Sequence, residues 1–284
     1  MISVFKKIYQ GFRSPHLALG YAMDKYQCSV DKKIHIPYLV VITGQKCTLR
    51  CKDCGNFTPY LPQTHYNIND LCDDINKFSS VARITLLQIQ GGEALIFPMF
   101  KELLNIVGGA ARFVTIATNG TRLLSEEQIT AVKAAKASLR ISDYGLIFLQ
   151  KADKLMAQCK ENHIDCNMYK FAVGTGNWID LGDKDTVKNC NIDVHNIFKS
   201  CPFKTCLTLE NGIIGRCSRA TVVHHIQKFI PKENDFVVLR NLNIKDLHEQ
   251  LLQYVLHPTP MEACRFCRGG RGRLIPPAIQ ITTQ

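Results

Sequence analysis

The sequence predicts an α/β fold built on a parallel sheet, followed by a small cysteine-rich unit. Apolar, β-branched runs of strand length alternate with stretches of helical periodicity between residues 37 and 171. One group of cysteines follows the first run, and a second group lies near the C-terminus. We therefore expect a helical appendage over 1–36, right-handed βαβ units over 37–185 and a hairpin-plus-helix unit over 186–284.

Five runs account for the predicted sheet. They cover residues 37–43, 84–89, 113–117, 139–142 and 164–171. The first is a continuous apolar, β-branched run, which is typical of a strand buried on both faces. Between the first two, Leu71, Ile75 and Phe78 recur at helical spacing, and Asn69 is expected to cap that helix. In the appendage, Val4 and Ile8 follow the same spacing, which favours a helix packed on the main unit.

Three cysteines, Cys47, Cys51 and Cys54, follow the first predicted strand at spacings of three and two intervening residues. A structural zinc or iron-sulfur site takes four protein ligands, and this loop supplies three. A cubane cluster held by three thiolates would leave one iron open to another ligand. The alternatives are an incidental group of thiols or a zinc site completed by a distant residue.

A second motif ends the predicted strand over 84–89. It reads Gln90, Gly91, Gly92 and Glu93. Glycines allow a ligand to approach the backbone closely, and a carboxylate can accept hydrogen bonds from an ammonium group. Two glycines alone indicate a tight turn, but this turn comes one βα unit after the cysteine loop, at the edge where parallel sheets place their chemistry.

On these motifs the sequence resembles the radical S-adenosylmethionine (radical SAM) superfamily. The resemblance implies a partial, TIM-like (β/α)6 barrel, a [4Fe-4S] cluster on the three cysteines, and SAM on the open iron with its amino group at the Gly-Gly-Glu turn. Cleavage of SAM would release a 5′-deoxyadenosyl radical that removes hydrogen from a substrate carbon. The turn at Asn119 and the strand end at Ser142 resemble the family's ribose-contacting positions, so both are cofactor-binding candidates together with Gln90.

One position departs from the family pattern. An aromatic residue usually precedes the third cysteine, and Asp53 stands there in this sequence. Phe57 or Tyr60 is the expected substitute for its contact with adenine.

Four cysteines form the C-terminal group: Cys201, Cys217, Cys264 and Cys267. Asn211-Gly212 between two apolar segments predicts a two-residue hairpin, which brings the first two cysteines toward each other. The pattern resembles the SPASM and Twitch domains of radical SAM enzymes and implies a second, auxiliary [4Fe-4S] cluster. A zinc ribbon is the alternative, and Cys206 is the residue most able to replace one of the four ligands.

Composition and charge indicate the cellular compartment and the kinds of partner to expect. The 13 cysteines are too many for inert packing and too scattered for a disulfide scaffold, which indicates a reducing cytoplasm. The sequence contains no signal-peptide core and no stretch long enough for a membrane span. The formal charge of +11 is partly offset by cluster-bound thiolates, so nucleic acid is an unlikely partner.

The expected activity is oxidation (dehydrogenation) of a small polar metabolite such as an amino sugar, driven by an external one-electron reductant of the flavodoxin or ferredoxin type. The alternative is modification of a ribosomally made peptide, by epimerisation or cross-linking. A more distant alternative is a non-enzymatic protein that binds zinc and nucleic acid.

Overall fold

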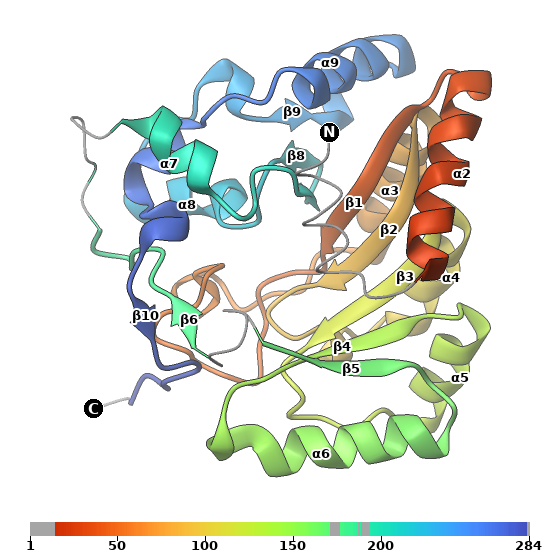
Figure 1. The fold of residues 1–284 in the computed structure, drawn as a ribbon, viewed down its shortest axis with the longest axis vertical. Coiled ribbons are helices and arrows are strands. Elements are labelled where there is room, and N and C mark those ends of the chain that lie inside the picture. Colours follow the sequence, from red (N-terminus) through yellow and green to blue (C-terminus); the bar gives the residue numbers. More distant parts are fainter. Residues whose placement is uncertain (1–14, 171–176, 187, 189–192, 283–284) are drawn as a thin grey trace.

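A mostly parallel sheet lies at the centre of the computed structural model, which describes residues 15–170, 177–186, 188 and 193–282. Its first five strands are β1 (Ile34–Ile42), β2 (Ala82–Gln90), β3 (Ala111–Thr118), β4 (Ser138–Ser142) and β5 (Cys166–Tyr169). Each pairs in parallel with the next, as Figure 1 shows. The five predicted strands and their parallel arrangement are therefore confirmed.

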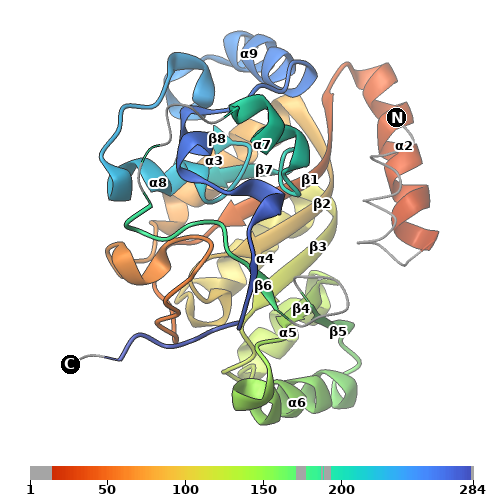
Figure 2. The same cartoon turned by 60° about the vertical axis from the view of Figure 1, so that its left-hand side comes forward.

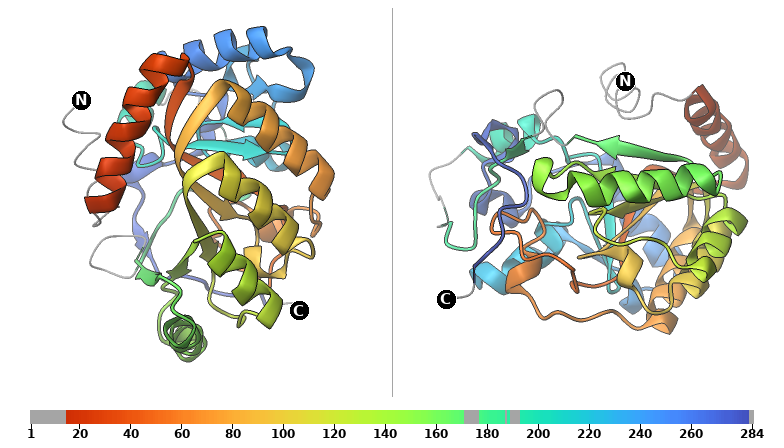
Figure 3. Two further views of the ribbon diagram at one scale, coloured as in Figure 1. Left: turned by 90° about the vertical axis from the view of Figure 1, so that its right-hand side faces the viewer. Right: turned by 90° about the horizontal axis from the view of Figure 1, so that it is seen from below.

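Helices on the outer face connect these strands. They are α3 (Ile68–Val81), α4 (Phe100–Ala110), α5 (Glu126–Ala134) and α6 (Leu146–Glu161). Figure 3 shows the first three stacked along one side of the sheet. The main core lies between them and the sheet, with Phe78 of α3 and Leu103 of α4 fully buried in it. The cap of α3 is Asn67 rather than Asn69, because the Asn67 side chain accepts hydrogen bonds from the first-turn amides.

The predicted hairpin is confirmed, and it extends the same sheet. Strands β7 (Leu207–Glu210) and β8 (Ile213–Gly215) are joined by Asn211 and Gly212 at φ values of 47° and 80°, as a two-residue turn requires. Strand β7 pairs in parallel with β1, and β8 pairs with β9 (Val237–Val238). The strand order is thus β5-β4-β3-β2-β1-β7-β8-β9 (Figure 2), and the sheet continues across the boundary expected near residue 185.

The remaining C-terminal elements lie on the side of the hairpin. They are the helices α7 (Val194–Ser200), α8 (Ala220–Gln227) and α9 (Ile244–Leu256) and the paired strands β6 (Trp178–Ile179) and β10 (Leu274–Ile275). A second hydrophobic cluster packs α8 against the short 3-10 helix η5 (Glu262–Phe266), which carries Cys264 and is followed directly by Cys267. None of the described helices has the length and apolar character required to cross a bilayer.

Helix α2 (Pro15–Asp31) lies along the amino-terminal parts of β1, β2 and β3. Gly20 permits this approach, since a Cβ there would overlap the Phe113 ring. Asp24, 1% exposed, accepts hydrogen bonds from the Arg112 Nε at 3.0 Å and from the Thr85 hydroxyl at 2.9 Å. The structure thus describes a helix within the appendage, at Pro15–Asp31, whereas the helix predicted from Val4 and Ile8 lies outside the described residues.

Replacing Asp24 with asparagine is expected to lower the free energy of unfolding by about 3 kcal/mol, because it removes the charge partner of Arg112 in a largely buried pair. Urea denaturation followed by circular dichroism measures the change. The matched control is Glu127→Gln, whose pair with Lys101 is 3.7 Å long and exposed. A loss there of more than about 1 kcal/mol, or none at Asp24, contradicts this account.

Candidate functional site

The inner face of the sheet lines a cavity of about 1530 Å³. Strand β2 shows how the side chains alternate between the two faces of the sheet. Gln88 and Gln90 line the cavity, whereas Leu87 and Ile89 point to the opposite face and are buried under the helices. Single-ligand pockets usually measure roughly 300–1,000 Å³. This cavity has room for a cofactor and a second molecule.

The cysteine loop leaves the carboxyl end of β1, and all three predicted cysteines line the cavity. The Cys47 sulfur accepts hydrogen bonds from the Leu49 amide at 3.4 Å and from the Asn119 Nδ2 at 3.7 Å. Burial raises the pKa of Cys47 to about 11 and that of Cys51 to about 12. Cys51 is thus buried and Cys47 half-buried, and the Cys47 sulfur faces two N–H donors, as the sulfurs of iron-sulfur ligands commonly do.

A segment near residue 280 covers this loop. Lys52 donates its amide to the Ile279 carbonyl and Ile281 donates to the Arg50 carbonyl, both at 2.8 Å. The Gln280 side chain donates to the Cys51 sulfur at 3.3 Å. Sequence reasoning missed Gln280, since a contact across 229 positions leaves no local pattern.

The Gly-Gly-Glu turn is fastened to the base of the cysteine loop. Gly92 donates its amide to the Gly44 carbonyl at 3.0 Å, and Glu93 donates to the Lys46 carbonyl at 2.9 Å. A Cβ on Gly92 would overlap the Lys46 carbonyl oxygen. Both predicted motifs are therefore parts of one backbone assembly, and Gly91 and Gly92 line the cavity.

The Glu93 side chain has a different environment. It is 2% exposed, and its carboxylate accepts hydrogen bonds from the Leu95 amide at 3.0 Å, the Thr118 hydroxyl at 2.8 Å and the Asn119 amide at 2.8 Å. Burial raises the pKa of this carboxyl group. Glu93 thus joins the ends of β2 and β3, and it is not among the residues that line the cavity.

The other predicted cofactor residues lie around the same opening. Asn119 donates to the Thr48 hydroxyl at 2.9 Å and so supports the cysteine loop from β3. Ser142 and Gln90 line the cavity at the ends of β4 and β2. The two aromatic candidates do not line it: Phe57 is buried beneath the Arg219 guanidinium, 3.9 Å from its ring centroid, and Tyr60 donates its hydroxyl to the Lys52 carbonyl.

The C-terminal cysteines approach the cavity from the hairpin side. Cys201 and Cys217 line it, and their sulfurs accept backbone amides at 3.4 and 3.3 Å. Cys267 accepts the Gly269 amide at 3.3 Å. Burial raises the pKa of Cys201 to about 11, and the nearby Cys267 and Cys264 thiols add to the rise, while a hydrogen bond from the Phe203 amide opposes it. Burial likewise raises the pKa of Cys217, and Cys201 and Cys267 add to that rise. These four thiols are therefore electrostatic neighbours.

Cys206 belongs to another part of the wall. Burial raises its pKa to about 11, and Arg140 is the charged neighbour that opposes this shift. Cys206 therefore lies between the strand face, where Arg140 is its neighbour, and Cys201 of the C-terminal group, whose pKa it helps to raise.

The described thiols are not arranged as a preformed site for a single metal ion. Within the described ranges, no three histidine, cysteine or acidic side chains converge closely enough to bind one metal ion. A tetrahedral zinc site gathers its sulfurs within about 2.3 Å of one centre. A cubane instead takes each thiolate on a separate iron, so its ligands stand farther apart.

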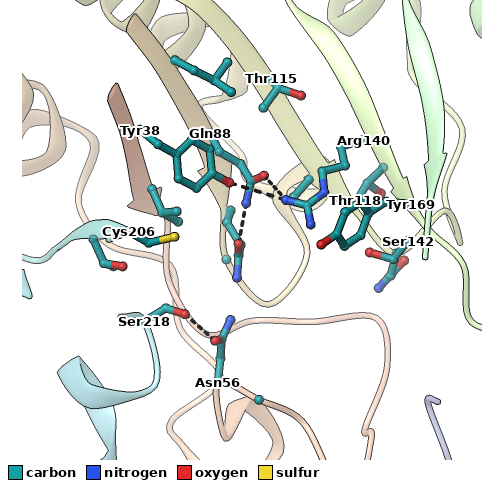
Figure 4. A pocket seen from close by; sticks show the side chains of 18 of the residues that line it. Tyr38, Asn56, Gln88, Thr115, Thr118, Arg140, Ser142, Tyr169, Cys206 and Ser218 are labelled. Carbon is teal, nitrogen blue, oxygen red and sulfur yellow. Dashed lines mark hydrogen bonds between the residues drawn. The ribbon is translucent and has the colours of Figure 1, made fainter. Parts of the chain in front are cut away.

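A network on the inner face was missed in the sequence. Arg140 of β4 donates to the Gln88 Oε1 at 2.7 Å and to the Tyr38 hydroxyl at 3.5 Å, and its guanidinium lies 3.4 Å from the Tyr169 ring centroid (Figure 4). Gln88 donates in turn to Gln90. The signal that was available is the placing of polar residues at alternate positions within apolar strands, on the face that cannot be core.

Comparison with known proteins identifies the fold of this chain through similar solved structures. No protein-family profile matches the chain, and no curated sequence matches it. Among solved structures it is similar to BtrN in complex with AdoMet and 2-DOIA, at 13% identity and a TM-score of 0.50, over 84% of this chain and 98% of BtrN. The expected α/β partial-barrel fold is therefore confirmed.

Two further structures are similar to smaller degrees. SuiB of Streptococcus suis, bound to precursor peptide SuiA, has 14% identity and a TM-score of 0.43 over 86% of this chain and 74% of SuiB. The protein anSMEcpe, with bound AdoMet and the Cp18Cys peptide, has 16% identity and a TM-score of 0.39 over 48% of this chain. The match spans 42% of anSMEcpe, less than half of its length.

Proposed function

We propose that this chain is a radical SAM enzyme that oxidises a small polar metabolite. The observation that carries the proposal is the fastening of the Cys47–Cys54 loop to the Gly-Gly-Glu turn at the mouth of a large cavity. The fold that the chain shares with BtrN, whose structure holds AdoMet, supports it. Twelve cysteines, all free, are described, which suits a reducing cytoplasm.

We assign the residues of the site to three roles, which are to hold the cluster, to hold SAM and to position the other two groups. Cys47, Cys51 and Cys54 would hold a [4Fe-4S] cluster, with Gln280 donating to the Cys51 sulfur. Backbone groups of Gly91 and Gly92, with the side chains of Gln90 and Ser142, would hold SAM along the strand ends. Glu93 and Asn119 act as positioning residues, because their side chains join β2, β3 and the cysteine loop.

The C-terminal group Cys201, Cys217, Cys264 and Cys267 would hold an auxiliary [4Fe-4S] cluster in a Twitch-like unit over 186–284. The cluster on the Cys47–Cys54 loop would supply the electron that splits SAM into methionine and a 5′-deoxyadenosyl radical, and the auxiliary cluster would accept the electron left on the substrate after hydrogen abstraction. A flavodoxin or ferredoxin type of protein would deliver the first electron.

The test is anaerobic reconstitution with iron and sulfide, followed by incubation with SAM and dithionite. Mass spectrometry is expected to detect 5′-deoxyadenosine that depends on dithionite. A colourless protein that contains zinc and forms no deoxyadenosine would refute the proposal and support the zinc-binding alternative. A peptide substrate remains the alternative within the proposed chemistry, and mass changes in peptides encoded beside the gene would establish it.

Iron content tests the auxiliary site. We expect about eight irons per chain in the reconstituted protein and about four after the double change Cys264→Ala and Cys267→Ala, from the stoichiometry of two cubanes. The matched control is Cys28→Ala with Cys72→Ala, two thiols on α2 and α3 outside the cavity. An unchanged iron count in the first variant, or a loss of four irons in the control, rejects this assignment.

A further inference from the structure

Arg140 projects from the middle of β4 into the cavity (Figure 4). It lies two residues before Ser142, so it stands one layer below the strand ends where SAM is proposed to bind. Its Nη1 donates to Gln88 and Tyr38, and one face of the guanidinium covers the Tyr169 ring. These contacts fix the plane of the guanidinium, and a guanidinium held in this way is oriented to bind a carboxylate or phosphate through two parallel hydrogen bonds.

Most of the hydrogen-bonding capacity of this guanidinium is unused. Arginine has five N–H donors, and within the described part of the chain the Nε and Nη2 groups of Arg140 have no acceptor, since both of its hydrogen bonds leave from Nη1. They belong to a side chain that lines the cavity.

The charge of Arg140 is also uncompensated. Across the described ranges, no carboxylate lies within ion-pair distance of it, and Asp143, which lines the same cavity, is paired with Lys170 at 3.8 Å. Asp53 and Asp165 line the cavity without contacting Arg140. The neighbouring Cys206 thiol does not neutralise it either, because burial raises the pKa of Cys206 to about 11. A half-buried cation without a counter-charge is costly unless a ligand supplies one.

A second polar group in the wall lacks a partner. Thr208 of β7 lines the cavity and is 1% exposed, and its hydroxyl has no hydrogen-bond partner among the described residues. Buried hydroxyl groups nearly always have one. The Thr208 hydroxyl lies on β7, four strands from Arg140 on β4 in the strand order. Polar groups that could bind a ligand are therefore found at two separate places in the cavity wall.

We propose that the substrate carries a carboxylate or phosphate group, and that Arg140 binds this group through its Nε and Nη2 donors on the floor of the cavity. The inference rests on the proposed function for its reaction, while the anion site itself stands on the contacts of Arg140. A bidentate pair between guanidinium and oxyanion would fix the substrate below SAM, with its other polar groups directed toward Thr208.

Trp178 provides a direct readout. It is the single tryptophan of the chain, it lines the same cavity, and its ring lies 5.4 Å from that of Tyr144. The reconstituted protein is titrated with inorganic phosphate and, separately, with acetate, each against sodium chloride at matched ionic strength. Tryptophan fluorescence and the thermal unfolding midpoint are recorded. We expect a saturable change with at least one oxyanion, and the tighter of the two identifies a phosphate or a carboxylate substrate.

Arg140→Gln is expected to weaken this binding by about 30-fold or more, because it removes the charge and the fork together. Arg140→Lys keeps the charge and is expected to give an intermediate loss, which also covers the case in which the glutamine variant does not fold. The control is Arg122→Gln, an exposed arginine outside the cavity, which is expected to bind as the wild type does. Equal binding in the wild type and both Arg140 variants, or no saturable response in the wild type, overturns the site.

The wild-type protein is assayed for deoxyadenosine in parallel. An anion response without deoxyadenosine refutes the proposed reaction and leaves the anion site standing. Deoxyadenosine without an anion response does the reverse.

Discussion

Replacing Cys51 with alanine is expected to abolish the reductive cleavage of SAM and to reduce the iron content from about eight to about four per chain. Cys51 is the most enclosed of the three loop thiols, at 7% exposure, and its sulfur accepts the Gln280 side chain. Two thiolates are too few to hold a cubane, so both the cluster and its chemistry would be lost together. Mass spectrometry of deoxyadenosine and an iron assay measure the two effects.

Cys28→Ala is the matched control for that variant. Cys28 is buried on α2, at 9% exposure, and is absent from the cavity wall. It is expected to retain both the iron and the deoxyadenosine of the wild type. Deoxyadenosine formation by the Cys51 variant at the wild-type level would show that this loop is not the site of SAM cleavage.

Gly92→Ala is expected to destabilise the protein by about 3 kcal/mol and to remove SAM cleavage as well. The added Cβ would collide with the Lys46 carbonyl, a backbone atom that cannot move without displacing the cysteine loop. The amide bonds from Gly92 to Gly44 and from Glu93 to Lys46 would be broken by the same displacement. Urea denaturation measures the loss of stability, and deoxyadenosine formation measures the loss at the site.

Gly109 in α4 offers the matched control. A Cβ there would meet no atom within 4 Å. Because alanine favours a helix over glycine, Gly109→Ala is expected to be neutral or stabilising by up to about 1 kcal/mol. If both alanine variants behaved alike, the close contact at Gly92 would not be what the protein requires there.

The elements that the sequence predicts well are those with a local cause. The strands are apolar runs with alternating faces, and the β7–β8 turn follows from Asn211-Gly212, whose residues accept positive φ. The cysteine loop and the Gly-Gly-Glu turn were expected at neighbouring strand ends, and the structure brings them together. Parallel topology alone requires this proximity.

What the sequence did not reveal depends on long-range pairing. No pattern in the sequence indicates that the Glu93 carboxylate accepts hydrogen bonds from Leu95, Thr118 and Asn119 and does not face the cavity. The cover that Gln280 places on Cys51 leaves no local trace either. The sequence does show Arg140 as a charged residue inside a predicted strand. Its hydrogen-bond partners, Tyr38 on β1 and Gln88 on β2, depend on the register of the sheet and could not be predicted.

The attachment of β7 to β1 has a consequence for attempts to dissect the chain. With β7 in place, the apolar run of β1 has hydrogen-bonded neighbours on both sides. A fragment ending near residue 185 would remove the β7 partner of residues 39–41 and leave that part of β1 at an open sheet edge, which is a template for self-association into aggregates. Without the hairpin, the first half of the chain is therefore expected to aggregate, whatever the C-terminal cysteines contribute.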